Sequence, residues 1–155
     1  MKTITAFICL SLLAMTSVYC ADEPEIKTSR IQIVDVNEQP WYEAADRAIA
    51  REIASPRNSK AERMSIAEIV IPAGVAVIPH HHLMEEVYHI VEGEGTMMVE
   101  DETAIIRKGQ SVIIAPHEWH SITNHTDKEL RLIVTCAPAW APEHLKFERL
   151  VESDN

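Results

Sequence analysis

Four polar side chains in the middle of the chain have the types and spacing of a metal site. His80 and His82 are separated by one residue, so on a β-strand both imidazoles project from one face while His81 points away. Glu86 follows His82 by four residues, and His120 lies in a later strand-like segment. Three imidazoles and a carboxylate that converge from separate strands suit one divalent transition metal: Mn, Fe, Zn, Ni or Co. Four protein ligands around a six-coordinate ion leave two positions for water or substrate, as catalysis requires.

Neighbouring residues compete for these roles. Seven of the eight histidines lie between positions 80 and 125, and a histidine-rich patch can bind stray metal without function. Glu85 stands beside Glu86, but strand alternation places Glu86 on the face shared with Tyr88. The same alternation turns His81 and His89 outward, as surface residues. A single buried histidine is usually a hydrogen-bonded core residue, so the spacing of all three candidates is what favours a ligand role.

Other side chains could serve the reaction itself. Tyr88 is the candidate catalytic residue because it could hydrogen-bond a substrate, with core packing as the alternative. No basic residue lies close to the candidate ligands in the sequence. Arg51, Arg63 and Arg107 could still reach a pocket in the folded chain.

The elements that must position these residues are short strands. From Ser65 onward, apolar runs of five to seven residues rich in β-branched side chains alternate with turn residues. This spacing predicts an all-β sandwich or barrel. Residues 41–53 fit either a short helix or the approach to a strand. Residues 145–151 alternate like a final strand, and Trp140 before them could close one end of the barrel.

The same pattern resembles the cupins. Their first motif, G-x5-H-x-H-x3,4-E-x6-G, is matched at every position and at permitted spacing; the matching residues are Gly74, His80, His82, Glu86 and Gly93. The resemblance implies a double-stranded β-helix, which is a small jelly-roll barrel, with a short N-terminal extension. It also implies that the metal ligands are His80, His82, Glu86 and His120.

The second cupin motif, G-x5-P-x-G-x2-H-x3-N, is present with one departure. Gly109, His120 and Asn124 keep its spacing, but Pro116 comes one residue late and His117 or Glu118 replaces the turn glycine. The loop before His120 is therefore the part of the match that departs from the family pattern. Asn124 also begins an Asn-His-Thr glycosylation sequon, but its place at the end of the motif is the better interpretation.

The first twenty residues have the pattern of a signal peptide. Lys2 precedes an apolar run of 12 residues, 4–15, which is too short to span a bilayer and is followed by small residues suited to cleavage before Ala21. A lipid anchor on Cys20 is a weaker alternative, because Tyr19 occupies a position where such signals carry a small residue. We therefore expect an exported protein, periplasmic or extracellular, with no transmembrane span in its mature chain.

These observations divide the chain. We expect a signal peptide at 1–20, a loose segment at 21–40, one cupin barrel at 41–151 with its motif core at 65–135, and a tail at 152–155. Removal of the signal peptide leaves Cys136 alone, so no internal disulfide forms, and this residue is expected to be a small buried hydrophobe. A homodimer is a further expectation.

Composition narrows the function. The 155 residues carry a net charge of −10, which argues against nucleic acid or an anionic membrane as partner. The resemblance implies a metal-binding cupin that acts as an enzyme on a small carboxylate, polyol or phenolic substrate. The cupins known to us include oxalate-acting enzymes, dioxygenases and isomerases, and the fold does not choose among them. The alternatives are a non-catalytic module that binds a small ligand and a cupin with a vestigial site.

Overall fold

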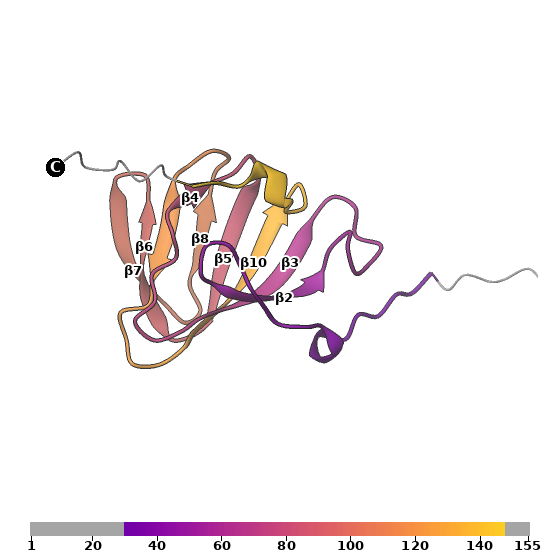
Figure 1. The fold of residues 1–155 in the computed structure, drawn as a ribbon, viewed down its shortest axis with the longest axis horizontal. Helices are drawn as coiled ribbons and strands as arrows, with labels where there is room; N and C mark the ends of the chain where they lie inside the picture. Colours follow the sequence, from indigo (N-terminus) through magenta and orange to yellow (C-terminus); the bar gives the residue numbers. More distant parts are fainter. Residues whose placement is uncertain (1–29, 148–155) are drawn as a thin grey trace, which may run out of the picture. The chain divides into compact units, whose positions relative to one another are not determined.

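Two antiparallel β-sheets are the main regular structure in the part of the chain that the computed structural model describes, residues 30–147 (Figure 1). The first sheet has the order β1-β2-β3-β10-β5-β8. Its strands are β1 (Tyr42–Glu43), β2 (Ile49–Ala54), β3 (Ser65–Ile71), β10 (Leu130–Ala137), β5 (Glu85–Glu92) and β8 (Ser111–Ile114). The second sheet has the order β11-β4-β9-β6-β7. Its strands are β11 (Lys146–Phe147), β4 (His80–His81), β9 (His120–Thr123), β6 (Glu94–Val99) and β7 (Glu102–Arg107). Two short 3₁₀ helices, η1 (Val36–Glu38) and η2 (Pro142–His144), precede β1 and β11.

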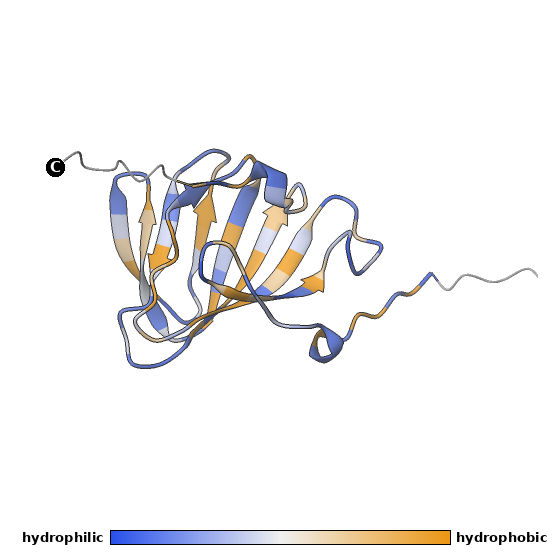
Figure 2. Cartoon of the chain, in the orientation of Figure 1, coloured by the Kyte–Doolittle hydropathy of each residue, from blue (hydrophilic) through white to orange (hydrophobic). Residues whose placement is uncertain are grey.

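Strand alternation decides which side chains enter the barrel. In β10 the residues Leu130, Leu132, Val134 and Cys136 are buried, while the residues between them are only partly so. In β5 the buried positions before the strand end are Glu86, Tyr88 and Ile90. Figure 2 shows the resulting bands of hydrophobic and hydrophilic residues along the strands.

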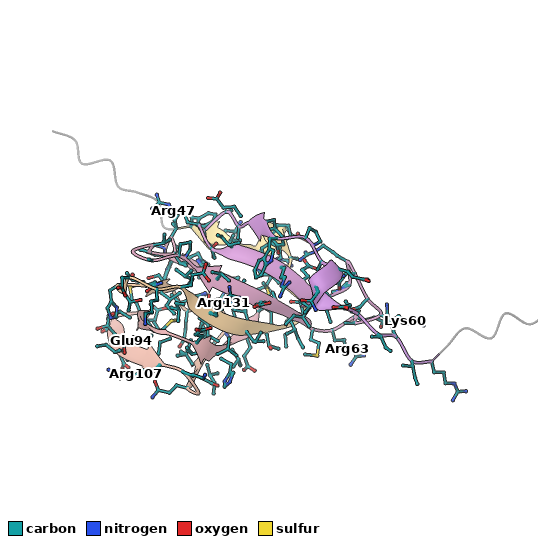
Figure 3. The ribbon with its side chains drawn as sticks, turned by 90° about the horizontal axis from the view of Figure 1, so that it is seen from below. Arg47, Lys60, Arg63, Glu94, Arg107 and Arg131 are labelled. Atoms are coloured by element: carbon teal, nitrogen blue, oxygen red, sulfur yellow. The ribbon has the colours of Figure 1, made fainter. Side chains whose placement is uncertain are left out.

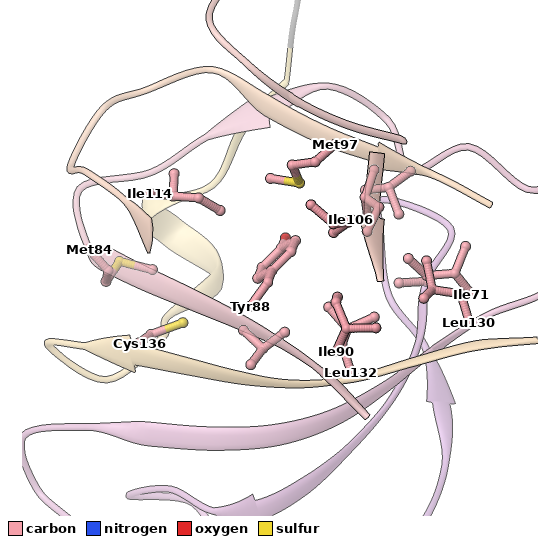
Figure 4. Close-up of a cluster of buried hydrophobic side chains, with 14 residues drawn as sticks. Ile71, Met84, Tyr88, Ile90, Met97, Ile106, Ile114, Leu130, Leu132 and Cys136 are labelled. Atoms are coloured by element: carbon pink, nitrogen blue, oxygen red, sulfur yellow. The ribbon is translucent and has the colours of Figure 1, made fainter. Parts of the chain in front are cut away.

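The hydrophobic core lies between the inner faces of the two sheets. Its members come from both sheets, because neither sheet could bury its apolar face alone. The cluster in Figure 4 includes Tyr88 and Leu132 from the first sheet and Met97, Ile106 and Ile122 from the second. Gly95 in β6 is required by this packing, because a Cβ there would lie 2.8 Å from the Leu130 side chain.

The structure confirms the predicted fold class, an all-β double-stranded barrel. The ambiguous segment 41–53 is strand rather than helix, with β1 and β2 paired as an antiparallel hairpin. Of the predicted last strand, 145–151, the structure describes residues 145–147, and two of these form β11; residues 148–151 lie outside the described part. The predicted signal peptide and the predicted tail also lie outside the described residues. None of the helices in residues 30–147 is long and apolar enough to cross a membrane.

Asn124 is a structural residue at the end of β9. It is fully buried, and its amide nitrogen donates to the carbonyl oxygens of Ile71 (2.9 Å), Pro72 (3.1 Å) and Lys128 (2.6 Å). Its amide oxygen accepts from the backbone and hydroxyl of Thr126. These bonds join the end of β3 to the loop before β10. This role agrees with the interpretation of Asn124 as the end of the second motif, and a fully buried amide is a poor glycosylation acceptor.

We expect Asn124→Ala to destabilise the fold, because buried carbonyl oxygens would lose their donor at a cost of about 1–3 kcal/mol. Urea unfolding followed by fluorescence measures the effect. The matched control is Asn37→Ala, since the Asn37 amide bonds only to the exposed Asp35. Equal unfolding midpoints for Asn124→Ala and wild type would contradict this role.

Candidate metal centre

Three histidines, from β4, from the residue that follows it and from β9, meet inside the barrel. His80 in β4 and His120 in β9 are direct partners across the second sheet, and His82 follows β4 directly, two residues after His80. All three are buried, and one ring nitrogen from each lies within 4.8 Å of the others. The ring of His120 lies between its neighbours, with centroids 4.3 Å from His80 and 5.0 Å from His82. The three imidazoles therefore converge as the strand alternation predicted.

Backbone carbonyl groups fix the orientation of all three rings. The Nδ1 atoms of His80, His82 and His120 lie 2.8, 3.1 and 2.9 Å from the carbonyl oxygens of Ile78, Met84 and Glu118. A carbonyl oxygen can only accept, so each Nδ1 carries a proton and donates it. In the neutral tautomer, each Nε2 then presents its lone pair. Metal-binding histidines show this arrangement, in which the second nitrogen is held by a backbone carbonyl or a carboxylate.

Glu86 completes the cluster from the first sheet. Its Oε2 lies 2.9 Å from His82 Nε2 and 3.2 Å from His120 Nε2, and the residue is only 4% exposed. Burial raises the pKa of Glu86, but the neighbouring imidazoles of His120 and His82 outweigh it and lower the pKa to about 2. The carboxylate is therefore ionised in the interior. The exposed Glu85 points away from this cluster, as the alternation requires.

The imidazoles respond to this charge in different ways. Burial and the neighbouring His120 lower the pKa of His80. Burial also lowers the pKa of His82, but its hydrogen bond with Glu86 outweighs that effect and raises the pKa overall. Without a metal ion, His82 is thus the ring that most readily takes the proton needed to balance Glu86.

Cys136 and Tyr88 surround the same carboxylate. Cys136 is the cross-strand partner of Glu86, and its thiol donates to Glu86 Oε1 at 3.2 Å. Burial and the adjacent carboxylate raise the pKa of both the Cys136 thiol and the Tyr88 hydroxyl. Both groups therefore stay protonated. The sequence predicted a buried Cys136 but not its contact with Glu86. Predicting that contact would have required the register of β10 against β5.

A cavity of about 350 Å³ lies beside the cluster. His80, Glu86 and Tyr88 form part of its wall, together with residues of the β1–β2 hairpin and of the segment from Trp140 to Phe147. The predicted candidate Tyr88 thus lies at the site. Whether its hydroxyl acts on a substrate stays a prediction.

The basic residue at this cavity is one that sequence reasoning missed. Arg57 contributes to the cavity wall, where it pairs with Glu52 and lies over the ring of Trp140. None of the three arginines suggested from the sequence is part of the wall. Arg51 is bound to Glu68, and Arg107 to Glu94 at the surface, where Figure 3 shows the two side by side. Arg63 is exposed (Figure 3).

The turn before His120 explains the departure from the second motif. His117 takes the glycine-like conformation, with φ of +71°, and its backbone N–H donates to the carbonyl of His82. The next residue, Glu118, closes the turn by accepting from the Ala115 N–H at 2.8 Å. The same Glu118 provides the carbonyl that orients His120. A histidine thus replaces the motif's glycine without loss of the turn.

Three other histidines of the segment lie outside the cluster. His89 is exposed, with its Nδ1 2.9 Å from the Ser111 hydroxyl. His81 is only half-buried and packs edge-on against Trp119 at 4.5 Å. His117 is exposed, as expected for a rim residue.

The chain matches a known family model and a related protein sequence. The model of the family described as Cupin domain matches residues 67–136. An uncharacterized protein of Methanocaldococcus jannaschii, MJ1618, is 32% identical over 103 residues, covering 66% of this chain and 82% of that protein.

Solved structures similar to this one share its fold. The polyketide cyclase RemF from Streptomyces resistomycificus has a TM-score of 0.67 at 17% identity, covering 79% of this chain and 88% of that one. An RmlC-like cupin from Shewanella frigidimarina has a TM-score of 0.61 at 18% identity, covering 73% of this chain and 94% of that one. A predicted oxalate decarboxylase from Thermotoga maritima has a TM-score of 0.61 at 20% identity, covering 69% of this chain and 99% of that one.

We expect His117→Gly to keep or raise the free energy of unfolding, by at most about 1 kcal/mol. A left-handed conformation costs an L-residue about 1–2 kcal/mol, which glycine avoids. Part of this stabilisation is lost because glycine has a larger entropy in the unfolded state. His117→Val should lower stability by about 1 kcal/mol or more, because β-branched residues resist positive φ. Thermal unfolding compares the two variants.

The control for these variants is Asp127→Gly, at an exposed turn residue without positive φ. It should lower stability slightly. If His117→Gly were as destabilising as Asp127→Gly, the turn would not be strained at His117.

Proposed function

This chain belongs to the cupin superfamily, and from that premise we propose that it binds one divalent transition metal and acts as an enzyme on a small molecule. The proposed ligands are Nε2 of His80, His82 and His120 and the carboxylate of Glu86. The proposed location is the one expected from the sequence, an exported protein.

One observation carries the metal assignment: all three Nδ1 atoms donate to backbone carbonyl groups. This leaves three Nε2 atoms that converge with a carboxylate in a buried space. Lone pairs and a negative charge repel one another unless a cation lies among them. A divalent metal supplies that cation, and nitrogen and oxygen donors suit first-row transition metals.

The donor set also fits the ion at the level of single atoms. His120 Nε2 is buried and, although 3.2 Å from Glu86 Oε2, makes no hydrogen bond. A buried polar atom without a partner calls for an explanation, and a bound ion is one of the usual ones. Cys136 holds the other oxygen of Glu86, so the carboxylate is oriented with Oε2 toward the imidazoles.

The cavity supports an enzyme that uses Tyr88. A bound metal would polarise an oxygen of the substrate as a Lewis acid. Tyr88 stays protonated next to Glu86, so its hydroxyl can donate a hydrogen bond to a substrate in the cavity. Glu86 and His80 fix the end of the cavity at which that oxygen would bind.

A second candidate function is a non-catalytic module that binds a small ligand on the metal. It is favoured by the chemistry of the two groups around Glu86. Cys136 and Tyr88 are both held protonated, so neither offers the general base or nucleophile that many reactions need.

We expect His80→Ala, His82→Ala and His120→Ala each to lose tightly bound metal, since each removes one of four protein donors. Glu86→Gln should weaken binding, because an amide oxygen is a poorer donor to a divalent cation than a carboxylate. Elemental analysis of protein purified without a histidine tag gives metal per chain, with circular dichroism to show that each variant is folded.

Three matched variants serve as controls. His81→Ala, His89→Ala and Glu85→Gln should keep wild-type metal content, because their side chains lie outside the cluster. Loss of metal with His81→Ala or Glu85→Gln but not with their neighbours would mean that the ligands are on the other face of the strands. A folded wild type that takes up no metal would overturn the proposal.

We expect Tyr88→Phe to separate the two candidate functions. If the protein is an enzyme, kcat should fall by about 10²–10³-fold, the usual contribution of a positioned hydrogen-bond donor, while metal content is unchanged. The measurement is turnover of small carboxylates, polyols and phenols by metal-loaded protein. Ligand binding without turnover by the wild type would leave the binding module as the function.

A further inference from the structure

The cavity beside the proposed metal site is lined mainly by apolar side chains. The first sheet and the hairpin leading to it provide alanines where larger residues would fill the space; these are Ala44, Ala45, Ala48, Ala50 and Ala67. Isoleucine, leucine and valine side chains from both sheets form much of the remaining wall. Sites lined in this way bind ligands largely through burial of apolar surface.

Aromatic rings stand at the side formed by the C-terminal segment. Trp140 and Phe147 both line the cavity, and the Phe147 ring lies edge-on to His80 with centroids 6.2 Å apart. An aromatic wall next to a ligand histidine favours a flat, apolar molecule bound beside the metal, since aromatic rings pair edge to face or in offset stacks.

Apart from a bound metal ion, the charges of the wall disfavour an anion. Its carboxylates come from Glu43, Asp46, Glu52 and Glu86, whereas Arg57 is the one arginine or lysine among the described lining residues. That guanidinium is already paired with Glu52. A substrate carboxylate would therefore find no free cationic side chain in this described wall, and the whole chain has a net charge of −10.

The size and polarity of the cavity also disfavour a polyol. About 350 Å³ lies at the lower end of the range for ligand pockets, about 300–1,000 Å³, and is enough for a molecule of one or two rings. A sugar or polyol in this space would bury several hydroxyl groups against apolar side chains. Each hydroxyl left without a hydrogen-bond partner would weaken binding.

We propose that the cavity binds an uncharged phenol of one or two aromatic rings, with its hydroxyl toward His80, Glu86 and Tyr88 and its ring among the alanines. This inference rests on the proposed function, because it names the substrate class of that same site. It selects the phenolic class over the carboxylate and polyol classes.

Titration of metal-loaded protein with 2,3-dihydroxynaphthalene, followed by the fluorescence of the probe, tests the proposal. Oxalate and sorbitol are compared by isothermal calorimetry under the same conditions. The diol should bind at least tenfold more tightly than either. Tighter binding of oxalate or sorbitol would overturn the proposal.

Two cavity-filling variants locate the binding. Ala50→Leu fills the wall from β2, and Ala45→Phe fills it from the hairpin loop, where a larger side chain threatens folding less. Each should weaken diol binding at least tenfold with metal content unchanged. The matched control, Ala104→Leu on the exposed face of β7, should bind as wild type does. Unchanged affinity in a folded cavity variant would place the diol elsewhere and overturn the proposal.

The metal-free protein separates this inference from the proposed function. 2-Naphthol, which has no second hydroxyl for chelation, should still bind there, and Ala45→Phe should still weaken it. Such binding in a protein that takes up no metal would support the phenol cavity and refute the metal enzyme. Metal uptake without binding of either naphthol would refute the phenol cavity alone.

Discussion

A carboxylate that is buried in the interior of a β-barrel must have donors or positive charge around it, and Glu86 is such a group. The strands at this end of the barrel place such groups around its carboxylate. The β5–β10 register sets Cys136 opposite it, and the β4–β9 pairing brings His80 and His120 together. In the metal-free chain the neighbouring imidazoles keep Glu86 ionised, with a pKa of about 2. A divalent ion would replace the proton on His82 with a stronger and better-centred positive charge.

The orientation of the rings depends on the backbone rather than on other side chains. Each Nδ1 is held by a carbonyl two residues away in the chain, so local conformation fixes each tautomer. This makes the turn at residues 115–118 important, because it places the carbonyl of Glu118 under His120. The glycine-like conformation of His117 is the local cost of that placement, and its N–H bond to the carbonyl of His82 ties the turn to the other ligand segment.

Period-two alternation predicted an all-β sandwich or barrel and the side chains that face its interior, whereas the jelly-roll barrel and the set of four ligands were implied by the cupin resemblance. It placed Glu86 rather than Glu85 inside, and turned His81 and His89 away, because the alternation of a strand is a local property. The identity of the basic residue at the cavity could not be predicted. Arg57 reaches the wall from the loop after β2 through its contacts with Glu52 and Trp140, which are set by tertiary packing.

Two further features depended on information that a single sequence lacks. The segment before Ile53 mixes alanines with charged residues, and such a pattern fits a helix or a strand until a partner strand is known. Here β3 is that partner. The contact of Cys136 with Glu86 needed the register of β10 against β5, because residues 50 positions apart in the chain carry no local signal of their pairing.

An anomalous difference map from a crystal of metal-loaded protein, recorded at the absorption edge of the bound element, tests the central claim most directly. A single peak within about 2.0–2.3 Å of Nε2 of His80, His82 and His120, and within a similar distance of a Glu86 oxygen, is the predicted result. A peak at the outward-facing His81 or His89, with the three Nε2 atoms bonded only to protein groups, would contradict it.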